Sequence, residues 1–96
     1  MDVASVLKEK REDILRIAGR HGARNVRVFG SVARGEADAA SDVDLLVSFD
    51  PETSLLQHAA LIRELQDFLG CHVDVADDEC LRPHMRDRVL NEATPL

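Results

Sequence analysis

Two aspartates one residue apart, Asp42 and Asp44, stand at the start of the apolar run LLVSF. Because side chains alternate along a strand, both carboxylates project from the same face, roughly 6 to 7 Å apart along the backbone. Two like charges this close cost free energy and raise one pKa unless a cation lies between them. Mg²⁺ binds oxygen ligands, commonly one or two carboxylates, and fills its remaining positions with water and phosphate oxygens. The pair therefore predicts a magnesium site next to a phosphate.

A glycine-serine pair, Gly30 and Ser31, precedes the acids and indicates where the phosphate would bind. A strand that ends in glycine and turns into a helix presents free backbone N–H groups and the positive end of the helix dipole. Ser31 adds a hydroxyl donor, and Arg34, one helical turn later, can reach a second phosphate oxygen with its planar guanidinium. These three residues predict an anion site beside the acidic pair.

Each of these features also has an ordinary alternative. Two acids at the edge of a strand are often solvated turn residues, and a single glycine-serine pair carries little information. Arg34 can form a surface ion pair with Glu36 or Asp38, which contributes little to stability. Asp74, between two valines, can be a solvent-facing strand residue. The order and spacing of these residues, rather than any one of them, favour the catalytic interpretation.

Hydrophobic periodicity and turn residues place these side chains on an alternation of helices and strands. Gly22 and Gly70 are typical helix stops, and alternation puts Leu46 on the same strand face as the two aspartates. The expected elements are a helix over 5–21, a strand over 25–30, one or two helical turns from Ser31, a strand over 42–49, a helix over 55–69 with Thr53 or Ser54 as N-cap, a strand over 71–76, and a helix over 82–93 with Pro83 in its first turn. This order predicts an α/β (α+β) fold with a small sheet flanked by helices.

The composition narrows the possible functions. The 96 residues predict a single domain over 1–96. A formal net charge of −6 argues against sequence-independent binding to DNA or RNA, and three Phe without Trp or Tyr leave no aromatic platform for single strands. Without a membrane-spanning stretch or a signal-peptide core, the chain is expected to be cytoplasmic. Cys71 and Cys80 are then expected to be reduced thiols, and the four His lack the spacing of a zinc site.

The stretch GSVARGEADAASDVDLLVSF resembles the GSxARGxxxxxSDxDLxV signature of the nucleotidyltransferase superfamily that includes DNA polymerase β. The short chain, with nothing beyond the catalytic core, resembles the minimal nucleotidyltransferases, and its tail VLNEATPL is similar to endings common among them. The resemblance covers nearly the whole chain and implies a small mixed sheet flanked by helices.

The resemblance also implies a role for each matching residue. The residues that would hold the nucleotide triphosphate are Gly30, Ser31, Arg34 and Ser41. The catalytic acids, which would also bind two Mg²⁺ ions, are Asp42, Asp44 and Asp74. In this family the third acid helps to activate the attacking hydroxyl. Asp74 is preferred for that role over Asp77 and Asp78, because only Asp74 lies within an apolar strand pattern.

The activity implied by the resemblance is Mg²⁺-dependent transfer of AMP from ATP to a hydroxyl of a partner protein. Minimal nucleotidyltransferases are typically paired with an all-helical HEPN ribonuclease, and act as its antitoxin by binding it and adenylylating a tyrosine. Two alternatives stay open at this point: an antitoxin that masks the ribonuclease without chemistry, and a nucleotidyltransferase for small molecules. Because few residues follow the catalytic core, we expect the acceptor to be recognised within a hetero-oligomer.

Overall fold

Within the described residues, 3–36 and 42–96, a computed structural model shows a mixed four-stranded sheet at the centre of the molecule. The strands are β1 (Ala23–Phe29), β2 (Val43–Phe49), β3 (Val73–Asp77) and β4 (Thr94–Pro95). The helices are α1 (Val3–Glu9), α2 (Arg11–Arg20), α3 (Gly30–Ala33), α4 (Leu55–Leu69) and α5 (Pro83–Glu92). The strand order is β3-β2-β1-β4, with β1 antiparallel to both neighbours and β2 parallel to β3. The small mixed sheet flanked by helices is confirmed.

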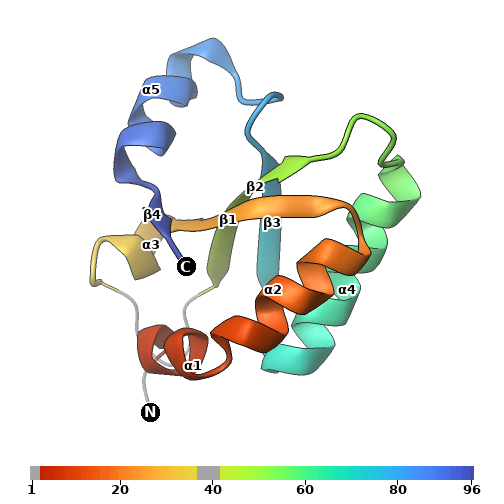
Figure 1. The fold of residues 1–96 in the computed structure, drawn as a ribbon. Coiled ribbons are helices and arrows are strands. Elements are labelled where there is room, and N and C mark those ends of the chain that lie inside the picture. The colour runs from red at the N-terminus through yellow and green to blue at the C-terminus, as the bar shows by residue number, and fades with distance from the viewer. Residues whose placement is uncertain (1–2, 37–41) are drawn as a thin grey trace.

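The two faces of the sheet are covered by different helices. The main core joins the inward side chains of β1, β2 and β3 to apolar residues of α1, α2 and α4. Figure 1 shows α2 and α4 side by side on one side of the strands, whereas α5 lies on the other. Val89 of α5 and Leu46 of β2 are both buried, yet they lie outside the main core cluster. Leu46 therefore shares the Asp44 face, as alternation predicts, and α5 helps to cover that face.

The prediction of a single helix over 5–21 is wrong in one respect, because the structure divides this segment into α1 and α2 at Lys10. Two hydrogen bonds still span the break, from Lys10 N–H to Val6 O and from Ile14 N–H to Lys10 O, both 3.0 Å. The Lys10 ammonium lies over the Phe68 ring of α4, 4.9 Å from its centroid. Both halves keep the same apolar periodicity, so the sequence pattern alone does not reveal the break.

Helix α4 has the ends that its sequence predicts. The Ser54 hydroxyl accepts a hydrogen bond from Gln57 N–H at 3.2 Å, which makes Ser54 rather than Thr53 the N-cap. At the other end Gly70 adopts φ +70°, a left-handed conformation that glycine takes without strain. Pro83 lies in the first turn of α5, also as predicted. None of the helices in the described ranges is long and apolar enough to cross a membrane.

Strand β4 was not predicted from the sequence. This two-residue strand pairs with the outer edge of β1, through the partners Arg27 with Pro95 and Val28 with Thr94. A further hydrogen bond, from Leu96 N–H to Val26 O at 3.1 Å, continues the contact. The tail thus returns from α5 to the sheet, and it fixes the C-terminal end of α5 close to β1.

Candidate active site

The sheet brings two of the predicted acids together. In the parallel pairing of β2 with β3, Asp44 and Asp74 are direct partners, and on the other side Asp44 pairs with Phe29 at the end of β1. Burial raises the pKa of Asp44, and the charges of Asp74 and Asp42 raise it further. The charges of Asp42 and Asp74 thus both act on Asp44.

Asp42 precedes β2 and is exposed, with its Oδ2 atom 3.6 Å from Nδ1 of His72. Asp74 is exposed as well, whereas Asp44 is half-buried between its neighbouring strands. The three acids therefore line one solvent-accessible edge, with Asp44 at its centre.

Asp77 and Asp78 have other contacts, at the opposite end of β3. Asp77 is the last residue of that strand, and its Oδ1 accepts a hydrogen bond from Glu79 N–H at 2.9 Å. Asp78 accepts hydrogen bonds from Arg27 at 2.7 Å and from the Ser48 hydroxyl at 2.5 Å. Neither lies beside Asp44 in the register, so the geometry supports the choice of Asp74.

Gly30 places the glycine-serine turn directly against the acids. Its φ is +74°, and a Cβ atom at this position would collide with Oδ2 of Asp44. Both the conformation and the space therefore require glycine. Ser31 follows in the first turn of α3 and is half-buried. The predicted anion site and the predicted metal site are adjacent. Ser41 lies outside the described residues.

Arg34 is held between two carboxylates. Its Nη1 donates to Glu92 Oε1 at 2.5 Å, and its Nε donates to Glu36 Oε2 at 3.0 Å. The other oxygen of Glu92 accepts the Gly30 N–H at 3.3 Å. The hydrogen bond from Arg34 holds the pKa of Glu92 below its usual range. The surface ion pair with Glu36 considered above is present, but the contact that joins Arg34 to α5 was not expected.

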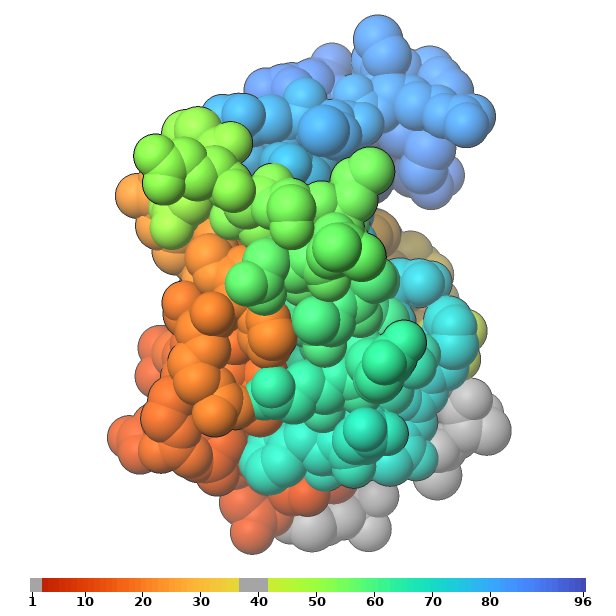
Figure 2. All heavy atoms as spheres, turned by 90° about the vertical axis from the view of Figure 1, so that its right-hand side faces the viewer, coloured from red at the N-terminus to blue at the C-terminus, as the bar shows by residue number. Residues whose placement is uncertain are grey.

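A pocket of about 390 Å³ opens between these elements. In Figure 2, α5 projects from the body of the molecule and the surface is hollowed beneath it. The residues that line the pocket are Phe29, Gly30, Ser31, Arg34, Asp42, Asp44, Met85, Arg88, Val89 and Glu92. The wall made by α5 was not predicted from the sequence. The one feature that could have indicated it is the spacing of Arg88 and Glu92, four residues apart on one helix face.

The acids of this site fit a hard divalent cation. No group of three or more potential ligand side chains within 3–36 and 42–96 already stands in a metal-binding arrangement. The raised pKa of Asp44, however, has the neighbouring acids among its causes, and a cation between them would offset that repulsion. Carboxylate oxygens beside a phosphate site are the ligands that Mg²⁺ uses. Asp42, Asp44 and Asp74 are the residues that would hold it.

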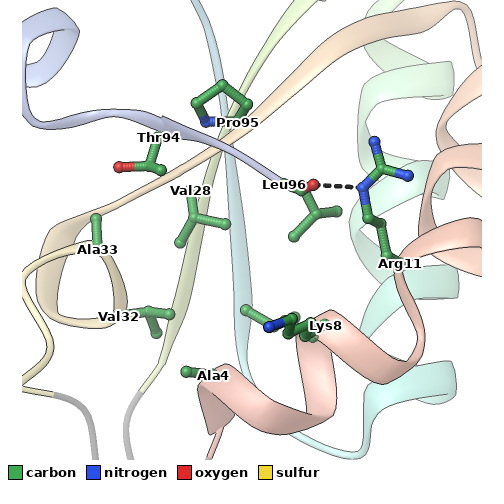
Figure 3. A pocket seen from close by; sticks show the side chains of 10 residues that line it. Ala4, Lys8, Arg11, Val28, Val32, Ala33, Thr94, Pro95 and Leu96 are labelled. Atoms are coloured by element: carbon green, nitrogen blue, oxygen red, sulfur yellow. Dashed lines mark hydrogen bonds between the residues drawn. The ribbon is translucent and has the colours of Figure 1, made fainter.

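A larger pocket, of about 470 Å³, lies among α1, α3 and the C-terminal tail. Figure 3 shows its apolar lining, which includes Val28, Val32 and Pro95. Its charged residues are Lys8 and Arg11, and Arg11 donates to the Leu96 carbonyl at 2.5 Å. No Asp or Glu side chain is among its lining residues, so it lacks the acids that line the pocket under α5.

Comparison with known proteins agrees with this geometry. The chain belongs to the nucleotidyltransferase domain family, whose model matches residues 7–95, and it is an enzyme of the minimal, DNA polymerase β-like type. A solved structure described as a candidate minimal nucleotidyltransferase is 50% identical, with a TM-score of 0.87 over 100% of this chain and 97% of that one.

Two relatives are similar over most of their length. A candidate protein adenylyltransferase of Methanocaldococcus jannaschii is 40% identical over 91% of this chain and 94% of its own. The protein adenylyltransferase MntA of Thermococcus cleftensis is 36% identical over 95% of this chain and 89% of its own. A toxin-antitoxin structure with AMP-PNP shares the fold, with a TM-score of 0.74 and 20% identity over 92% of this chain and 70% of that one.

Proposed function

We propose that this chain transfers AMP from ATP to a tyrosine hydroxyl of a HEPN-type ribonuclease toxin in the cytoplasm, and so acts as its antitoxin. The observation that carries the proposal is the pairing of Asp44 with Asp74, with Gly30 packed against Asp44. Asp42, Asp44 and the glycine-serine turn line one pocket, and Asp74 is the strand partner of Asp44 beside it. The names of the two relatives, both protein adenylyltransferases, support the choice of a protein acceptor.

Each predicted residue has a role in this proposal. Gly30 and Ser31 bind phosphate oxygens through backbone N–H groups and the serine hydroxyl, with Arg34 and Ser41 as further ligands. Asp42, Asp44 and Asp74 would hold two Mg²⁺ ions, whose positive charge would stabilise the negative charge that develops during the transfer. Asp74 is exposed on β3 and is therefore accessible to an acceptor hydroxyl.

The transfer is a single displacement at the α-phosphorus of ATP. The acceptor oxygen forms a new bond to this phosphorus while the bond to the bridging oxygen breaks, and pyrophosphate leaves. The hydroxyl proton passes to the Asp74 carboxylate as the new bond forms. The product is a tyrosine that carries AMP through a phosphodiester.

Attachment of AMP gives a specific mode of inhibition. A ribonuclease must hold polyanionic RNA near its catalytic residues, and AMP on a nearby tyrosine adds bulk and negative charge there. The inhibition should therefore persist after the antitoxin is removed. A masking antitoxin would act only while bound, with an occupancy set by mass action.

The test is to incubate the cognate ribonuclease with this protein, ATP and Mg²⁺, separate the two under denaturing conditions, and refold the ribonuclease. We expect its mass to rise by one or more AMP units and its RNA cleavage to stay blocked. A parallel incubation with the Asp74→Asn variant serves as the control. Recovery of an unmodified, active ribonuclease from the wild-type mixture would contradict the proposal and favour masking.

A further inference from the structure

The pocket needs more positive charge than Arg34 supplies. Arg34 bonds two carboxylates, Glu36 and Glu92, and its charge is therefore already balanced where the triphosphate would bind. The same pocket holds the acids Asp42 and Asp44. Metal ions between those acids and the phosphates would offset mainly the charge of the acids, and Arg34 is offset by Glu36 and Glu92. An additional cation would therefore strengthen the binding of a triphosphate.

Arg88 is in the right place to supply that cation. It lines the same pocket from α5, one helical turn before Glu92, and its charge is close enough to lower the pKa of Glu92. Its side chain is exposed, and within the part of the chain that the structure describes it makes no hydrogen bond or ion pair. Its donors are thus available, in contrast to those of Arg34.

The helix beneath Arg88 is firmly seated. Its neighbour Val89 is 2% exposed, and the Ala93 N–H to Val89 O hydrogen bond, 2.9 Å long, closes the last turn. Glu92, one turn further on, ties the helix to Gly30 and Arg34. The backbone of Arg88 is therefore fixed opposite the glycine-serine turn, while its long side chain can reach across the pocket.

We propose that Arg88 is a phosphate-binding residue of the nucleotide site, and that α5 forms its second wall. A triphosphate bound at Gly30 and Ser31 then lies between α3 and α5, and the planar guanidinium of Arg88 makes charge-assisted hydrogen bonds to it. This inference rests on the proposed function, because it presumes that the pocket binds ATP.

The test is calorimetric titration of the full chain with ATP in Mg²⁺. We expect Arg88→Ala to weaken ATP binding about tenfold, the loss typical of one charge-assisted hydrogen bond. Arg88→Lys should recover part of this loss, since an ammonium keeps the charge but not the fork. Arg86→Ala is the matched control, because Arg86 is exposed on the same helix and does not line the pocket. It should change the affinity less than about twofold.

A second titration, with AMP, tests which part of the nucleotide is bound. Arg88→Ala should affect AMP much less than ATP, and an equal loss for both would contradict a triphosphate contact. Wild-type affinity for ATP in Arg88→Ala, or an equal loss in Arg86→Ala, would overturn the inference and leave the proposed function intact. Failure of the wild-type protein to bind ATP would instead overturn the proposed function itself.

Discussion

A single residue, Glu92, contacts both Gly30 of the glycine-serine turn and Arg34. Its two carboxylate oxygens bond the Gly30 N–H and the Arg34 guanidinium, two of the groups that the sequence assigns to phosphate. The same carboxylate therefore holds α5 to α3 and partly satisfies the anion site. Arg34 serves as a structural link in this arrangement, and its role in binding phosphate stays a prediction.

The three acids should contribute differently when changed one at a time. Asp74 lies at the exposed edge and on a different strand from the other two, so Asp74→Asn should leave ATP affinity within about threefold of wild type. Transfer should fall by about 100-fold or more, because the variant lacks a base for the acceptor hydroxyl. Calorimetry and labelling with radioactive ATP measure the two effects separately. Transfer at the wild-type rate would show that Asp74 is not the third acid.

At the scale of elements, the sequence predicted the parts whose signals are local. The ends of α4 follow from Ser54 and Gly70, and the strand carrying Asp44 follows from its apolar alternation. The break at Lys10, the strand β4 and the pocket wall of α5 were missed. Each of these depends on packing between segments far apart in sequence, and periodicity within a segment does not report it.

In the candidate site too, the features with local sequence signals were predicted and those that depend on long-range packing were not. The register of β2 and β3, which makes Asp44 and Asp74 partners, depends on strand pairing that no local pattern specifies. The family resemblance supplied Asp74 as the third acid but not its pairing with Asp44, whereas the carboxylate pair and the glycine-serine turn followed from local spacing. Neither the resemblance nor the local spacing had assigned a role to Glu92 or Arg88.

A second polar cluster ties the sheet together at the end remote from the acids. Asp78 accepts hydrogen bonds from Arg27 of β1 and Ser48 of β2, and the side chains of Arg27 and Asp78 are 14% and 20% exposed. Burial opposes ionisation, but the bonds from Ser48 and Arg27 outweigh it and hold the pKa of Asp78 below its usual value. Asp78→Asn should therefore destabilise the fold by about 2 kcal/mol at neutral pH. Urea unfolding measures this loss.

The pH dependence of that loss has a definite sign. A carboxylate whose pKa is lowered by folding contributes its full stability above its unfolded pKa, about 3.9, and loses it as pH falls through the folded value. The difference in free energy of unfolding between wild type and Asp78→Asn should thus shrink below about pH 4. Asp77→Asn is the control, because an amide oxygen can still accept the Glu79 N–H. A gap that stays constant with pH would show that the charge of Asp78 contributes nothing.

For the molecule as a whole, the active-site acids carry part of a net charge of −6. Asp44 is half-buried, and its pKa is raised by burial, by Asp74 and by Asp42, so its ionised form opposes folding in the absence of a cation. Functional sites commonly retain such unfavourable groups. The stability of this protein should therefore depend on the ligands that its acids bind.

Asp44→Asn should separate stability from ligand response. Without divalent metal, we expect its Tm to rise by about 2 to 4 °C, since solvent screens these half-exposed charges and leaves roughly half a kcal/mol. In the wild type, Mg²⁺ with ATP at a hundredfold excess over Kd should raise the free energy of unfolding by about 2.7 kcal/mol, and Tm should rise with it. Asp44→Asn should lose most of this response, because it lacks the central carboxylate.

Asp67→Asn, which removes one exposed charge from α4, should keep the full response and the wild-type Tm. Scanning calorimetry with and without Mg²⁺ and ATP gives all of these values. A lower Tm for metal-free Asp44→Asn would mean that Asp44 does not repel its neighbours, and an undiminished shift with ligand would mean that Asp44 does not bind the metal.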